Sequence, residues 1–75
     1  VEAEPDNVAY RDSLGWVYYR LGRLKEARQE LETASRLSPD DPAILDHLGD
    51  VYLELGEREK SLAVYRRALE LAGDE

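Results

Sequence analysis

The segment Asp46-His-Leu-Gly-Asp-Val-Tyr52 has a near copy earlier in the chain, Asp12-Ser-Leu-Gly-Trp-Val-Tyr18. The offset between the copies is 34 residues, the interval from Gly15 to Gly49. A fixed period of this size is typical of stacked supersecondary units, none of which buries its apolar face alone. The repeat therefore decides the fold.

Apolar residues recur at helical spacing in four segments of the chain. The stripes run through Val8–Leu21, Leu24–Leu37, Ile44–Leu55 and Leu62–Ala72. Strand-like alternation is nowhere sustained. We therefore expect four helices.

The boundaries of these helices have chemical causes. Asn7 and Asp41 can each accept hydrogen bonds from first-turn amides, and Pro42 stands where a missing N–H costs nothing. Gly22 and Gly56 each follow a leucine and can adopt the left-handed conformation that ends a helix. The next helix then turns back antiparallel.

Length and charge narrow the function classes. The chain has 75 residues, a net charge of −7 and no cysteine. It therefore has neither a disulfide framework nor a thiolate metal site, and it has no apolar run near the roughly 18 residues that span a membrane. Residues 8–41 are neutral, whereas residues 42–75 carry four bases and eight acids. Nucleic acid is disfavoured because its binding needs a basic stripe, and a basic or apolar partner fits better.

The paired motifs Leu14-Gly15-x-x-Tyr18 and Leu48-Gly49-x-x-Tyr52 resemble the tetratricopeptide repeat. The pattern has a physical reason: the glycine leaves the backbone nearly bare where two helices cross, and the leucine and tyrosine fill the space around the crossing. The resemblance implies an all-α fold, an α-solenoid of two helix-turn-helix repeats with four antiparallel helices and no capping helix. The expected divisions are a lead-in at 1–7, a first repeat at 8–41 and a second at 42–75.

Three positions depart from the family pattern. Arg11 stands where the family has tryptophan, Ser61 replaces an alanine, and Gly73 replaces the closing proline. Because the chain begins at Val1 with neither methionine nor a signal-like segment, we expect it to be excised from a longer protein. Nothing in the sequence indicates a cellular compartment.

Translating one repeat onto the other places unlike charges at equivalent positions, which predicts cross-repeat ion pairs that bias register. The six predicted pairs are Arg20/Glu54, Arg23/Glu57, Lys25/Glu59, Glu26/Lys60, Glu32/Arg66 and Arg36/Glu70. The alternative is that such charges populate any well-solvated helix.

The resemblance implies that the first helix of each repeat lines a concave surface that holds an extended peptide or a partner helix. Counting turns away from the core face gives its lining. The expected partner-binding residues are Ala9, Asp12, Ser13, Trp16, Tyr19 and Arg20, then Ala43, Asp46, His47, Asp50, Leu53 and Glu54. The Lys/Asn/Arg set with which some family members clamp a terminal carboxylate is not at these places. Trp16 and Tyr19 could instead anchor an apolar or basic ligand, unless Trp16 merely covers the neighbouring helix.

The last helix suggests an alternative function. It offers Leu62, Val64 and Leu69 where the first repeat has Arg28, Glu30 and Ser35, so its outer face is more apolar than an array's end should be. The alternative is thus a structural module that forms homo-oligomers through its terminal helix faces. The competing interpretation is an ordinary helix on which a few leucines happen to be exposed.

Catalysis is not expected. Ser13, His47 and Asp50 can be assembled into a hydrolytic set on paper, but no nucleophile elbow or oxyanion donor accompanies them. Asp46, His47 and Asp50 could touch a divalent cation only weakly on one open face, so a solvated acidic patch is the preferred interpretation. No glycine loop suits a phosphate cofactor. The prediction is a protein-binding module without a cofactor, a metal or an enzymatic activity.

Overall fold

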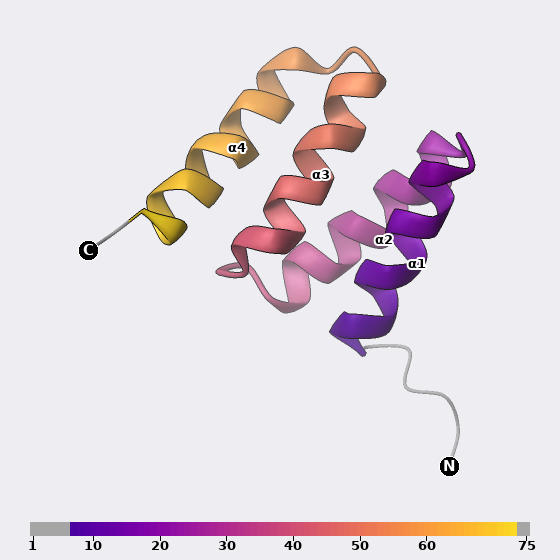
Figure 1. Ribbon diagram of the computed structural model, residues 1–75, viewed down its shortest axis with the longest axis horizontal. Helices are drawn as coiled ribbons and strands as arrows, with labels where there is room; N and C mark the ends of the chain where they lie inside the picture. Colours follow the sequence, from indigo (N-terminus) through magenta and orange to yellow (C-terminus); the bar gives the residue numbers. More distant parts are fainter. Residues whose placement is uncertain (1–6, 74–75) are drawn as a thin grey trace.

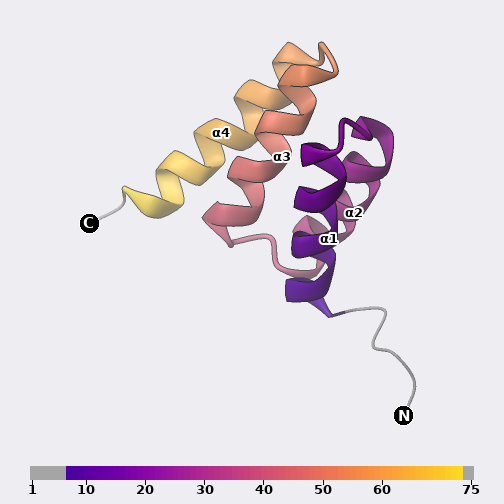
Figure 2. The same cartoon turned by 45° about the vertical axis from the view of Figure 1, so that its right-hand side comes forward.

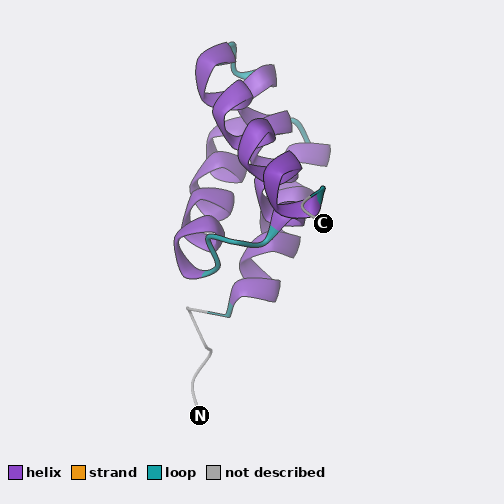
Figure 3. Cartoon of the chain, turned by 90° about the vertical axis from the view of Figure 1, so that its left-hand side faces the viewer, coloured by secondary structure: helices purple, strands orange, loops and turns teal. Residues whose placement is uncertain are grey.

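A computed structural model describes residues 7–73 and contains four helices in that range. They are α1 (Val8–Arg20), α2 (Leu24–Leu37), α3 (Pro42–Glu54) and α4 (Arg58–Ala72), as Figure 1 shows. The described part of the chain has no strand (Figure 3). The all-α prediction is confirmed. The expected lead-in at 1–7 lies, apart from Asn7, outside the described residues.

The helices form two antiparallel hairpins that lie one beside the other. α1 packs on α2 and α3 packs on α4, while α2 packs on α3 and α1 also touches α3 (Figures 1 and 2). The first helix of the second hairpin therefore rests on both helices of the first.

The predicted helix boundaries are confirmed. The amide of Tyr10 donates to Asn7 Oδ1 at 3.0 Å, and the amide of Ala43 donates to Asp41 Oδ1 at 3.0 Å. Gly22 and Gly56 have φ angles of 81° and 82°, which side-chain-bearing residues rarely adopt. Each glycine therefore reverses the chain within a hairpin.

Gly15 and Gly49 lie where the two helices of each hairpin cross, as predicted. A Cβ on Gly15 would stand 2.6 Å from Leu31 Cγ, and one on Gly49 would stand 2.4 Å from Tyr65 Cε1. Neither position has room for a side chain, so the glycines permit the close approach of the helices.

One apolar cluster joins the two hairpins. Its buried members come from α2 and α3, with Tyr18, Tyr19, Leu55 and Val64 packed partly buried against it. The buried members are Ala27, Leu31, Leu48, Val51 and Tyr52. The molecule is only 15 Å across its shortest axis, so few residues are far enough from water to be fully buried.

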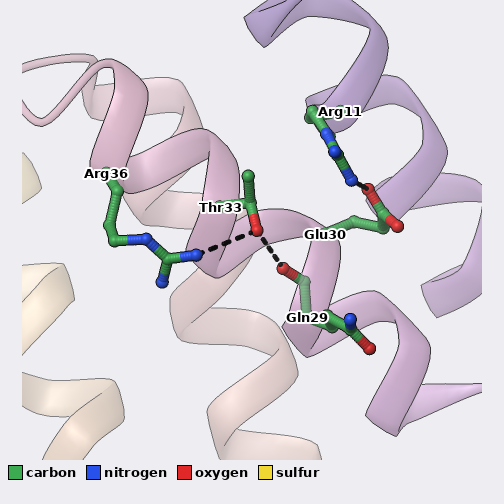
Figure 4. A network of polar contacts seen from close by, with 5 residues as sticks. All are labelled: Arg11, Gln29, Glu30, Thr33 and Arg36. Carbon is green, nitrogen blue, oxygen red and sulfur yellow. Dashed lines mark hydrogen bonds and ion pairs between the residues drawn. The ribbon is translucent and has the colours of Figure 1, made fainter. Parts of the chain in front are cut away.

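Two departures from the family pattern have structural partners. Arg11 donates to Glu30 Oε1 at 2.8 Å across α1 and α2, next to an α2 network in which Arg36 donates to Thr33 (Figure 4). Ser61 is buried and donates through Oγ to the carbonyl oxygen of Gly49 at 3.0 Å. A small hydroxyl thus replaces a methyl group without leaving an unsatisfied polar atom.

The six predicted cross-repeat charge pairs are wrong: within residues 7–73, none of them forms an ion pair. Instead Arg28 Nη1 lies 2.9 Å from Glu57 Oε2, and Tyr52 donates to Glu32 at 2.7 Å. Both contacts join α2 to the second hairpin. Four of the six predicted pairs join α2 to α4, and within residues 7–73 these two helices do not contact each other, because α2 packs on α3.

Candidate protein-binding surface

Three aromatic rings stack where α1 and α3 lie side by side. The ring centroid of Trp16 is 4.8 Å from that of Tyr19 and 4.3 Å from that of His47, with interplanar angles of 20° and 27°. Trp16 and Tyr19 are three residues apart and so share one side of α1. His47 occupies the equivalent stretch of α3. We call the surface formed by these rings and their polar neighbours the α1/α3 face.

His47 is held from a second direction by α1. Its Nδ1 lies 2.9 Å from Asp12 Oδ1, and neither side chain is fully buried. The sequence placed Ser13 beside His47, but the polar partner in the structure is Asp12, and Ser13 is exposed. The Ser/His/Asp arrangement drawn from the sequence is therefore not formed, because His47 bonds to a carboxylate instead of a nucleophile.

Asp50 is tied to α4. Its Oδ1 accepts a hydrogen bond from the Tyr65 hydroxyl. Burial, together with this hydrogen bond and the charge of Asp50, raises the pKa of Tyr65 to about 12. Tyr65 was not among the residues predicted for the site. The repeat comparison could have identified Tyr65, because this residue replaces Leu31 of the first repeat and introduces a hydroxyl that can form a hydrogen bond.

The carboxylates of Asp50 and Glu54 make the surroundings of Tyr19 negative. Burial first, and then the charges of these two groups, raise the pKa of the Tyr19 hydroxyl. Glu54 is exposed and forms no ion pair with any residue in 7–73. An accessible carboxylate without an ion-pair partner in residues 7–73 therefore acts on Tyr19, one of the stacked rings.

The remaining predicted site residues occupy the edges of this face. Arg20 and Leu53 are exposed at the C-terminal ends of α1 and α3, and Ala9 and Asp46 are exposed nearer their N-terminal ends. Ala43 is also exposed. Asp46 and Ala43 border a groove shared with α4, so they are not confined to the α1/α3 face.

That groove separates the N-terminal half of α3 from the C-terminal half of α4. It has a volume of about 380 Å³, and Asp46 lies at its rim. Its other lining residues are Pro42, Ala43, Tyr65, Ala68, Leu69 and Ala72. We call it the tail groove. Its apolar lining is open to solvent.

The three residues predicted for self-association lie in different places. Leu62 and Leu69 are exposed on α4 as expected, and Leu69 lines the tail groove. Val64 instead is partly buried against the core cluster. A helix places residues 62 and 64 about 200° apart around its axis, so the two cannot share one face.

The described residues contain no group of three or more His, Cys, Asp or Glu side chains arranged to hold a metal ion. None of the helices within residues 7–73 has the length and apolar character needed to cross a bilayer. What the α1/α3 face does offer is aromatic area and accessible negative charge, which are suited to non-covalent recognition.

Antiparallel helix pairs that repeat at a fixed interval, with aromatic and charged side chains along their first helices, define the class of α-helical repeat proteins. Comparison with known families specifies the class further. A family model described as TPR repeat matches residues 15–56, and another described as Tetratricopeptide repeat matches residues 42–75. The chain belongs to the tetratricopeptide repeat family, whose repeats generally mediate protein–protein interaction. A comparison with curated proteins finds no match.

Proposed function

We propose that the α1/α3 face binds a basic segment of a partner protein. The observation that supports this most directly is the Trp16 ring, which stacks on His47 and on Tyr19, a residue whose hydroxyl is within the field of Asp50 and Glu54. A ring that is already held in place loses little conformational entropy when a ligand packs on it.

Arginine suits this surface better than lysine. A guanidinium group is planar, so it can stack on an indole or phenol while its edge donates to a carboxylate. Glu54 is available for such a bond, because it has no ion-pair partner within residues 7–73. Asp12 and Asp50 already accept hydrogen bonds and serve mainly to set the local potential.

The binding experiment uses the intrinsic fluorescence of Trp16, the one tryptophan of the chain. Extended peptides with two arginines are titrated into the protein, beside matched peptides with lysine or glutamate at those places. We expect saturable binding in the order arginine, lysine, glutamate, weakening as salt is raised. Equal responses to the arginine and glutamate peptides would contradict the proposal.

The matched variants are Glu54→Lys and Glu59→Lys. Both reverse one exposed carboxylate and change net charge equally, but Glu59 lies on α4, outside the α1/α3 face. We expect Glu54→Lys to weaken arginine-peptide binding about tenfold, or ~1.4 kcal/mol, and Glu59→Lys to have little effect. Equal weakening by both would mean that only net charge matters. Asp50→Lys is a poorer test because it also removes the hydrogen bond from Tyr65.

Self-association through the terminal helices is a second candidate function. Leu62 and Leu69 support it, because each presents more than half of its surface to solvent on α4.

A further inference from the structure

We propose that two copies of this chain stack head to tail, with α1 of one copy seated in the tail groove of the other. The proposal does not rest on peptide binding. It rests on the internal repeat, because the molecule already contains one example of the contact, in which α3 is seated on the first hairpin.

The first surface needed for stacking is an exposed stripe along α1 and its C-cap residue, formed by Tyr10, Val17 and Leu21. Shifted by one repeat, these positions become residues 44, 51 and 55 of α3. Val51 belongs to the cluster that joins the hairpins and is 0% exposed, whereas Val17 is 51% exposed. Ile44 is 1% exposed and Tyr10 59%. We call this stripe the head face: it has the apolar pattern of a docked helix, but no helix within residues 7–73 packs on it.

The second surface is the tail groove. Tyr65 and Ala68 in its lining are the equivalents of Leu31 and Ala34, which are both 0% exposed, and Leu31 packs in the cluster that joins the two hairpins. In the tail groove Ala68 is already buried at 6% exposure and Tyr65 is partly buried, whereas the neighbouring Leu69 is 72% exposed. The groove is therefore the same receiving surface, one repeat later.

The polar contacts between the hairpins are partly preserved by the same shift. The Glu32–Tyr52 hydrogen bond becomes Arg66 of one copy opposite Tyr18 of the next. Asp12 beside His47 becomes Asp46 opposite Ser13, which can donate a hydrogen bond.

The third polar contact changes its chemistry in the stack. Arg28 beside Glu57 becomes Leu62 opposite Arg23, so an apolar contact with the arginine stem replaces an ion pair. Leu62 is thereby placed at the junction between copies.

Charge disfavours one alternative orientation, tail-to-tail contact. Residues 8–41 are neutral, and residues 42–75 carry four bases and eight acids. Head-to-tail contact sets a neutral repeat against an acidic one, whereas tail-to-tail contact sets two acidic repeats together. Because the operation that relates successive copies does not close on itself after two, the assembly can continue beyond a dimer.

The first test is the solution mass of the unmodified chain, measured by light scattering and sedimentation from micromolar to millimolar concentration. We expect the mass to rise with concentration past that of two chains. A mass that stays at 8.6 kDa over this range would overturn the proposal. A plateau at two chains would also overturn it, because it indicates a closed, symmetric dimer.

The second test mixes a variant whose head face is disrupted with a variant whose tail groove is disrupted. Val17→Asp places a charge on the head face and Leu69→Asp places one in the tail groove, each at a site more than half exposed in the single molecule. Each variant alone should associate more than about tenfold more weakly than the unmodified chain, because stacking would bury the new carboxylate. An equimolar mixture retains one intact head face and one intact tail groove, so it should form two-chain complexes and stop there. A mixture as weakly associated as its components would refute head-to-tail stacking.

Ala63→Asp is the matched control, since Ala63 is exposed and its equivalent Gln29 stays exposed even with the second hairpin in place. It should leave association unchanged, and equal loss in this variant would show a non-specific effect of charge. Circular dichroism checks that every variant keeps its helices. Leu21→Asp and Leu62→Asp replace any variant that does not. Variants at Val17 and Leu69 should still bind the arginine peptides, which separates failure of stacking from failure of the proposed function.

Discussion

At the scale of the residue, Gly15 shows how little room the helix crossing leaves. The Cβ of an alanine here would lie 2.6 Å from Cγ of Leu31, a side chain that is fully buried and has nowhere to move. Alanine gains up to about 1 kcal/mol in helix propensity over glycine. Overpacking a core contact costs about 1–3 kcal/mol, so we expect Gly15→Ala to lower the free energy of unfolding by roughly 1–2 kcal/mol.

Chemical denaturation measures this change, with Ser13→Ala as its control. Ser13 is exposed on the same helix, so its replacement tests propensity without a packing change and should stay within about 0.5 kcal/mol of the unmodified chain. If Gly15→Ala proved as stable as the unmodified chain, the helices could separate at little cost and the crossing would not depend on glycine.

Residue identity alone predicted part of the α1/α3 face. Trp16, Tyr19 and His47 were each assigned to it, and the structure brings their rings together. The partner of His47 was not predicted correctly, because the repeat shift tells which helices adjoin but not how each side chain is directed across the junction. A rotation of a few tens of degrees decides whether Asp12 or Ser13 is nearer to the imidazole.

At the scale of the element, the four helix starts divide into two kinds. α1 and α3 have side-chain caps, from Asn7 and Asp41, whereas α2 and α4 begin at Arg23 and Glu57 without a side-chain cap bond. The first two starts are thus stabilised locally. The other two follow tight corners and depend on the packing of their hairpins.

This difference predicts that substitutions at the capped and uncapped helix starts lower the free energy of unfolding by different amounts. Asp41→Ala should lower the free energy of unfolding by about 0.5–2 kcal/mol, because the amide of Ala43 loses its hydrogen bond. Arg23→Ala, at a start without a cap bond, should change it by less than about 0.5 kcal/mol, since its ion pair with Glu26 is exposed. Thermal and denaturant unfolding measure both. Similar losses in the two variants would mean that capping does not distinguish the helix starts.

The elements were the best predicted level of the structure. Helical spacing, cap residues and the corner glycines all act within a few residues, so the printed sequence contains their causes. The charge pairs across the repeats were not predicted correctly, because the repeat shift pairs α2 with α4, whereas within residues 7–73 α2 packs on α3 and does not contact α4. Glu57, which precedes α4, meets Arg28 instead of Arg23.

At the scale of the whole molecule, the structure is a pair of hairpins joined by one shared cluster. Val51 of the second hairpin packs in that cluster with Ala27 and Leu31 of the first. Repeat proteins derive much of their stability from such junctions, because each unit has too small a core to fold strongly alone. The contribution of a neighbouring repeat should therefore be measurable at a position that occurs once with a neighbour and once without.

Val17 and Val51 are such a pair, since they are the same residue one repeat apart. Val51 is 0% exposed and Val17 is 51% exposed. We expect Val51→Ala to lower the free energy of unfolding by roughly 1–3 kcal/mol through loss of packing at the junction, and Val17→Ala to lower it by less than about 0.5 kcal/mol. Denaturant unfolding at low protein concentration measures both, and hydrogen exchange should show faster opening in both hairpins of Val51→Ala. Loss confined to α3 and α4 would mean that the hairpins unfold independently.

If the chains stack as proposed, the loss of unfolding free energy caused by Val17→Ala should increase with protein concentration, because Val17 then becomes as buried as Val51.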